Sequence, residues 1–306
     1  NNINAGRIDV VALSGQTSIG YGAAATTLKN TSNLYGTKNT AIGFQTLTNT
    51  VYGKENTALG YQALYHNNTA SGSTAIGYQA MFNAYNLNTA TQYNTYNTAV
   101  GYQALLGSST QANNNGRSNT ALGHQTLRSN SSGSNNSALG YLALYMNSTG
   151  QGNTGLGYNS LYGNTTGQYN TAVGYGLVNN DIGNYNTAIG YNTLSSNASG
   201  NYNTGIGYNA EITGNVSNST VIGNGATTAA SNTIQLGNGS VTNVNTSGSI
   251  TAGEDMSLKH LKGTTAKPTV TFYGVNAGVT DLIISGTDLG GFIQFTTRAS
   301  TSKDIG

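Results

Sequence analysis

Cysteine and tryptophan are absent from this sequence, and proline occurs once. Charged residues make up only 7% of the 306 positions, against about a quarter in ordinary soluble domains. The absence of cysteine excludes disulfide bonds and thiol chemistry. So little charge, together with 43 glycines and 21 tyrosines, is atypical of a cytosolic enzyme.

Basic clusters and long apolar runs are also missing. The formal net charge is +2, and there is no basic stripe of the kind that binding to a phosphate backbone requires. No stretch of roughly 18 consecutive apolar residues is present. Residues 1–10 have neither the basic start nor the apolar stretch of a signal peptide. We therefore expect no nucleic-acid partner and no membrane insertion.

The few charges are unevenly distributed along the chain. Four charged residues occur between Asn56 and Gly253, namely Arg117, Arg128, Asp181 and Glu211. Residues 254–306 contain ten charged residues, which is half of the total. This change in composition predicts a boundary between two kinds of structure.

A nine-residue phrase recurs along most of the chain, as in NTALGYQAL from Asn56 to Leu64. Its fifth position is glycine. The glycines of the ten clearest copies are Gly43, Gly60, Gly77, Gly101, Gly123, Gly140, Gly157, Gly174, Gly190 and Gly207. Most copies are 16 or 17 residues apart, and insertions of five to seven residues lengthen the others. This spacing indicates a solenoid with a 17-residue base period, while glycine in mid-phrase disfavours a helix.

Within each phrase, bulky and small residues alternate with the period of a β-strand. Thr40, Ile42 and Phe44 are expected on one face of the strand, and Ala41 and Gly43 on the other. We expect the bulky face to form the packed side of the strand. The small face would allow another backbone to approach closely, so we expect it to be buried in a three-fold bundle of chains.

Two other phrase positions predict columns of like side chains. Asparagine at the first position can form amide ladders that cap the turns below. Tyrosine after the phrase glycine would form a second column, either as a stacking ladder between coils or as a surface for sugars. His124 occupies a tyrosine position, which indicates a surface or packing substitute rather than a ligand.

These observations predict an all-β chain built around a parallel β-solenoid, or β-roll, of about 13 coils. We expect a connector over residues 1–15, the solenoid over 16–245, a linker over 246–268 and a small β-domain over 269–306. The thin core contributed by each coil favours a homotrimer over a free-standing monomer.

The phrase N-T-A-I-G resembles the head repeats of trimeric autotransporter adhesins, most closely in NSTVIGNGA from Asn218 and SNTIQLGNG from Ser231. The longer form GYNSLYGNTTGQYNTAVGY, residues 157–175, is similar to repeats of bacteriophage tail-fibre proteins. GTDLGGFIQFTT, residues 286–297, resembles a short β-domain near the ends of phage fibres.

The resemblance implies an elongated, extracellular, homotrimeric fibre segment of a phage tail fibre. Such a fibre mediates attachment to a glycan or protein of the host surface. The alternative is a bacterial trimeric adhesin or extracellular filament subunit on the cell surface, and a sugar-cleaving tailspike is the third reading. We place recognition in the charged C-terminal region, at Lys259, Lys262, Asp281, Asp288 and Arg298.

No enzyme, cofactor or metal chemistry is predicted. His66, His124 and His260 are too scattered for a metal site. Asp181 and Glu211 are isolated in the repeat region, whereas glycosidases need two carboxylates facing one bond. Several N-x-S/T triplets occur, at Asn67, Asn130, Asn147, Asn164, Asn197 and Asn218, and in so Asn-rich a chain they are expected by chance.

Overall fold

A computed structural model describes residues 15–25, 36–84, 93–176, 183–196 and 199–241. The chain divides into two units, Asn1–Val244 and Asn245–Gly306, and all described residues belong to the first. The linker and the small β-domain expected over 246–268 and 269–306 lie outside the described residues. So does nearly all of the N-terminal connector.

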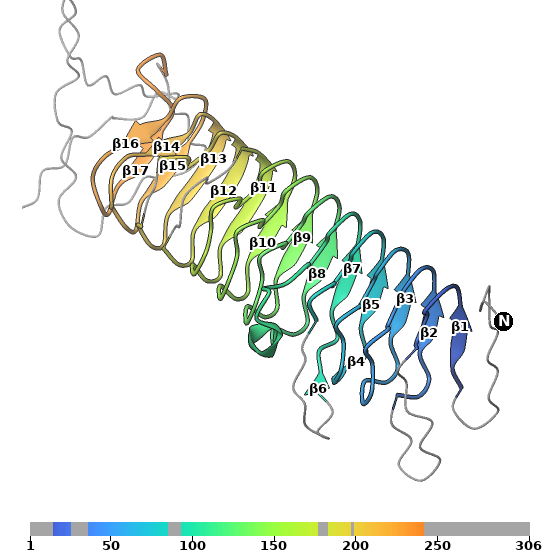
Figure 1. Cartoon of the computed structure of the whole chain (residues 1–306). Helices are drawn as coiled ribbons and strands as arrows, with labels where there is room; N and C mark the ends of the chain where they lie inside the picture. Colours follow the sequence, from blue (N-terminus) through green and yellow to red (C-terminus); the bar gives the residue numbers. More distant parts are fainter. Residues whose placement is uncertain (1–14, 26–35, 85–92, 177–182, 197–198, 242–306) are drawn as a thin grey trace, which may run out of the picture. The chain divides into compact units, whose positions relative to one another are not determined.

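The first unit is a parallel β-solenoid with one strand of its main sheet in each coil. Thirteen strands form this sheet and pair in chain order, and Figure 1 shows them side by side from β1 to β17. The strands are β1 Thr17–Ile19, β2 Thr40–Ile42, β3 Thr57–Leu59, β5 Thr74–Ile76, β7 Thr98–Val100, β8 Thr120–Leu122, β9 Ser137–Leu139, β10 Thr154–Leu156, β11 Thr171–Tyr175, β12 Thr187–Tyr191, β13 Thr204–Tyr208, β15 Thr220–Ile222 and β17 Ile234–Leu236. The predicted all-β solenoid is confirmed.

The register places equal phrase positions directly above one another. Thr40 pairs with Thr57, for example, and Ile42 pairs with Leu59. The pairing is parallel along the whole sheet, as expected when each strand begins a new coil. Because every coil repeats the same phrase in register, each position of the phrase becomes a column along the solenoid.

Additional short elements lie outside the main sheet. β4 (Ala70–Ser71) pairs with β6 (Tyr93–Asn94), and β14 (Glu211–Ile212) pairs with β16 (Thr227–Thr228). A single 3-10 turn, η1, spans Gln111–Asn113. It belongs to the insertion that follows β7 and projects from the coils in Figure 1. In the described residues there is no other helical segment.

The interior of the solenoid is filled by small residues of the strand and by leucine beyond the turn. Third-position alanines such as Ala58 and Ala121 are fully buried. Ninth-position residues such as Leu64 and Leu127 are buried with them. The expectation for the two faces of the strand was therefore wrong, because the alanine side faces the core of its own chain. The bulky side of the strand faces outward.

The physical reason is the leucine that enters the core from beyond the turn. A Cβ atom on the third-position Gly155 would already lie 3.3 Å from Leu144 Cγ, so most coils have only a small residue beneath the strand, and Val221 is the largest third-position side chain that is fully buried. The ninth residues are also held in the left-handed backbone region, with φ near +50° at Leu47, Leu64 and Leu127. Burying a leucine contributes about 1.5–3 kcal/mol, whereas left-handed backbone costs about 1–2 kcal/mol. The leucine column alone therefore adds little net stability.

The phrase glycines allow the close stacking of consecutive coils. Gly43, Gly60 and Gly77 have φ of +131°, +131° and +130°. A Cβ atom on Gly60 would lie 2.8 Å from the carbonyl carbon of Gly77. The expectation that these glycines permit close backbone approach is confirmed, but the approaching backbone is the next coil of the same chain.

The predicted asparagine ladder runs through the interior edge of the coils. The backbone N–H of Asn56 donates to Asn39 Oδ1 at 2.9 Å, and Asn39 Nδ2 donates to the Gly53 carbonyl at 2.9 Å. The same pair of bonds recurs at Asn136, whose Oδ1 accepts from the Asn153 N–H and whose Nδ2 donates to Gly150. Each amide thus joins its own coil to the turn and strand of the next.

Candidate functional site

The second, fourth and sixth phrase positions form the outward face of the main sheet. The second position is almost always threonine and the fourth is isoleucine, leucine or valine. The aliphatic side chains remain substantially exposed, with 49% for Leu139 and 39% for Ile189. The outward face is therefore an uncharged surface with exposed aliphatic and aromatic side chains between its threonines, and no other described segment of the chain buries it.

The sixth position forms a column of stacked aromatic rings along one margin of the outward face. Neighbouring ring centroids lie 4.8 to 5.4 Å apart. The column consists of Tyr21, Phe44, Tyr61, Tyr78, Tyr102, His124, Tyr141, Tyr158, Tyr175, Tyr191 and Tyr208. The stacking interpretation is confirmed, and His124 packs between Tyr102 and Tyr141 as expected.

Charge is absent from the outward face, although a few charged residues lie elsewhere on the coils. The described residues contain six charged side chains, and none occupies an outward position: Lys38, Lys54, Glu55, Arg117, Arg128 and Glu211. The recognition residues predicted from sequence lie outside the described residues. They are Lys259, Lys262, Asp281, Asp288 and Arg298. The structure therefore describes the outward face but does not test the prediction for these five side chains.

The two described carboxylates have structural partners. Glu55 forms an ion pair with Lys38 at 3.3 Å. Glu211 accepts bonds from the backbone N–H groups of Ser195 and Ser196, each at 3.1 Å, and from the Ser195 hydroxyl. Within the described ranges there is no group of three His, Asp or Glu side chains that could hold a metal ion. In the same residues no helix is long and apolar enough to cross a bilayer.

Several asparagines of the N-x-S/T triplets lie inside the solenoid. Asn67, Asn147 and Asn164 are fully buried, and Asn130 is 4% exposed. Their amides donate to backbone carbonyls three residues ahead, as Asn147 does to Gly150 at 3.0 Å. A glycan could not be attached to these side chains in the folded chain. Asn197 is outside the described residues.

Partial burial perturbs the acidity of His66. Burial lowers the pKa of His66 below its ordinary value of 6.5. Its ring contacts Tyr65 and Phe82 edge-on and lies 3.3 Å from Asn49 Nδ2. The environment thus favours the neutral ring.

We expect the stability of this coil to fall as the pH drops below about 6.5. The unfolded chain takes up the proton more readily than the folded one, so protonation favours unfolding, and the loss levels off below the lowered pKa. The neighbouring coils have asparagine at the equivalent position, Asn49 and Asn83. The variant His66→Asn should therefore fold normally and lose the part of the pH dependence that comes from His66. Melting temperatures at about pH 8 and about pH 5 measure it. An unchanged pH dependence in the variant would contradict the assignment.

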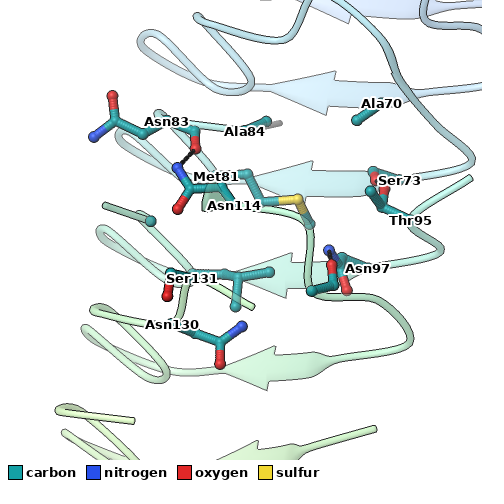
Figure 2. Close-up of a pocket in the computed structure, with 13 residues that line it drawn as sticks. Ala70, Ser73, Met81, Asn83, Ala84, Thr95, Asn97, Asn114, Asn130 and Ser131 are labelled. Atoms are coloured by element: carbon teal, nitrogen blue, oxygen red, sulfur yellow. Dashed lines mark hydrogen bonds between the residues drawn. The ribbon is translucent and has the colours of Figure 1, made fainter. Parts of the chain in front are cut away.

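A small cavity of about 20 Å³ interrupts the core where the two long coils meet. Met81, Asn97 and Asn114 line it, as Figure 2 shows. The Asn114 amide donates to the Asn83 carbonyl of the preceding coil. A cavity of this size is large enough for one water molecule, although most of its walls are apolar. It is a packing defect created by the insertions rather than a binding site for a larger molecule.

One set of structural residues was missed by sequence reasoning. The seventh position is also left-handed, and its glutamines form a ladder, with Gln62 Nε2 donating to Gln45 Oε1 at 2.9 Å. The position later carries Asn159, Gly176 and Asn192. Asparagine and glycine tolerate positive φ best, so their recurrence there was a readable signal.

Comparisons with family models, with curated proteins and with solved structures give no match for this chain. The coil geometry defines its class. It is a repeat protein of the parallel β-solenoid type. The outward face of its main sheet has no charged side chain.

Proposed function

We propose that this chain is a structural segment of an extracellular bacteriophage tail fibre, in which three copies associate through the outward face and hold a host-binding end. The observation that carries the proposal is the uncharged, exposed apolar face of thirteen strands. Monomeric soluble proteins rarely expose contiguous apolar surfaces larger than a few hundred Å².

The size of the outward face fits a stable protein interface. Strands spaced about 4.8 Å apart give a length of about 58 Å, and four residue steps of about 3.3 Å give a width of about 13 Å. The product is roughly 800 Å² per chain, which a trimer divides between two neighbours, so the three faces together bury roughly 2,400 Å², against about 1,600 Å² in a standard two-chain interface. The resemblance of the phrase to trimeric adhesin heads and phage fibres supports three copies rather than two.

Leu139→Lys tests the interface. We expect the variant to keep its coils, because Leu139 lies outside the core, and to sediment as a monomer while the unchanged chain sediments as three. Three buried lysines would meet without a partner charge, which costs several kcal/mol. A fibre that loses multivalency should also lose most of its attachment to target cells.

Met146→Lys is the matched control, since Met146 is 44% exposed but lies away from the outward face. Its assembly should be unchanged. A folded wild-type monomer would overturn the proposal. A Leu139→Lys variant that still forms a trimer would show that the chains do not associate through the outward face. A two-chain assembly that Leu139→Lys dissociates would retain the face and overturn the three-fold symmetry.

The bacterial adhesin or filament subunit remains the second candidate, because it would use the same solenoid and the same interface. The coding sequence on either side of this chain distinguishes the two, through a tail-attachment or chaperone domain in one case and a coiled-coil stalk with an anchor in the other. No observation on the described residues favours a sugar-cleaving spike. Both described carboxylates are engaged in structural contacts.

A further inference from the structure

The insertion after β7 breaks the regular surface of the solenoid. Residues 107–114 leave the coil, form η1 and return to it. Beside them lies a recess of about 340 Å³, which is lined by Gly107, Ser108, Asn113, Arg128, Ser129, Ser131 and Ser148. This volume is within the usual range of small-molecule sites.

The lip of the recess is held in place by its own hydrogen bonds. The backbone N–H of Ser108 donates to Asn114 Oδ1 at 2.9 Å, and Asn114 Nδ2 donates back to the Ser108 carbonyl at 2.8 Å. The Gly107 N–H donates to the Arg128 carbonyl of the next coil at 3.0 Å. A pre-formed recess costs little ordering when a ligand binds.

Arg128 supplies the only charge in the recess lining. Its Nε donates to Gln103 Oε1 at 3.3 Å, and its guanidinium lies 5.7 Å from the ring centroid of Tyr145. The hydrogen bond holds the Nε edge of the guanidinium, and the ring contact holds one of its faces. In the described part of the chain the terminal nitrogens Nη1 and Nη2 have no hydrogen-bond partner. A guanidinium fork of this kind matches a carboxylate in bidentate geometry.

Four of the other six lining residues are serines, and the remaining two are Gly107 and Asn113. Serine hydroxyls both donate and accept, as the hydroxyls of a sugar do. Tyr145 stacks on Tyr162 with a centroid distance of 5.2 Å and also carries the Arg128 guanidinium over its ring, so this aromatic pair holds the guanidinium in position beside the serines. A single positive charge balances a monoanion better than a phosphate dianion.

We propose that this recess binds a carboxylate-bearing monosaccharide unit, with the carboxylate on Arg128 and the ring hydroxyls on the serines. The inference rests on the proposed function and names a receptor class for it, in addition to the recognition expected beyond residue 253. The recess lies past the turn that ends the outward face. Assembly of the trimer through that face leaves it accessible.

Titration of the full chain with glucuronate, observed by NMR or calorimetry, tests the proposal. We expect saturable binding of glucuronate and at least about 10-fold weaker binding of glucose, because glucose lacks the carboxylate that pairs with the guanidinium. Arg128→Gln should lose about 10-fold or more in affinity. Arg117→Gln is the control, since Arg117 stacks on Tyr93 outside the recess and its loss should leave the affinity unchanged.

Arg128→Lys and Ser129→Ala extend the test. Lysine keeps the charge without the fork and should retain part of the affinity, whereas Ser129→Ala should weaken both glucuronate and glucose. The inference would be overturned if glucose bound as tightly as glucuronate, or if Arg128→Gln and Arg117→Gln lost the same affinity. It would also be overturned if inorganic phosphate bound as tightly as glucuronate. Absent binding by a chain that still sediments as a trimer would overturn it and leave the fibre proposal standing.

Discussion

Gly157→Ala is expected to separate the stack of coils at β10. The backbone of Gly157 has φ of +122°, a region that side chains rarely adopt. A Cβ atom there would lie 2.9 Å from the carbonyl carbon of Gly174 and still closer to its oxygen. Because both atoms belong to the backbone of the next coil, no rotamer change relieves the clash. We expect a loss of more than about 4 kcal/mol, which is exceptional for one substitution.

The damage should be local, because each coil of a solenoid contacts only its neighbours. Limited proteolysis should therefore cut Gly157→Ala between β10 and β11, and thermal unfolding should become biphasic. Gly214→Ala is the control, since Gly214 has φ of +85° but nothing within 4 Å of the added Cβ. It reports the backbone strain without the clash. Equal melting of the two variants would refute the close-approach explanation.

Asn136→Ala is expected to cost about 2–3 kcal/mol. Asn136 is fully buried, and its amide accepts the N–H of Asn153 and donates to the carbonyl of Gly150, both at 2.9 Å. Alanine leaves the Asn153 N–H buried without an acceptor. The Gly150 carbonyl keeps one donor, the Asn147 amide. The cost should therefore come mainly from the single orphaned N–H. Chemical denaturation with a circular-dichroism readout measures the loss.

Asn136→Ser should lie between alanine and the wild type, because serine occupies the same ladder position naturally at Ser73 and Ser219. Ser219 Oγ donates to the carbonyl of Ala230 at 2.8 Å, so a hydroxyl can replace part of the amide's role. Asn113→Ala, at an exposed position of η1, should change stability by less than about 0.5 kcal/mol. If Asn113→Ala and Asn136→Ala cost the same, the ladder has no special role.

The columns at the first and sixth phrase positions show how a sequence repeat allows contacts to be predicted. A residue that returns every 17 positions must lie over its own copy once coils stack, so asparagine predicts an amide ladder and tyrosine a ring stack. Both predictions are confirmed at Asn39 and Asn56 and at Tyr61 and Tyr78. The recess beside Arg128 was not readable in this way. It depends on an insertion whose path no periodicity describes.

Sequence alone therefore determined the solenoid, its period, the close approach at glycine and the asparagine ladder, because each follows from spacing and residue type. Only the tertiary structure decided which face of the strand is inside. Alternation places Ala58 and Leu59 on opposite faces of the strand but does not say which face is buried. Hydrophobicity favoured burial of the Leu59 face, which was wrong. The answer depends on the ninth-position leucines, such as Leu64, which enter the core from beyond the turn and lie there with the alanines of the strand. Because the leucines occupy this space, the inward residues of the strand are small and its larger residues face outward.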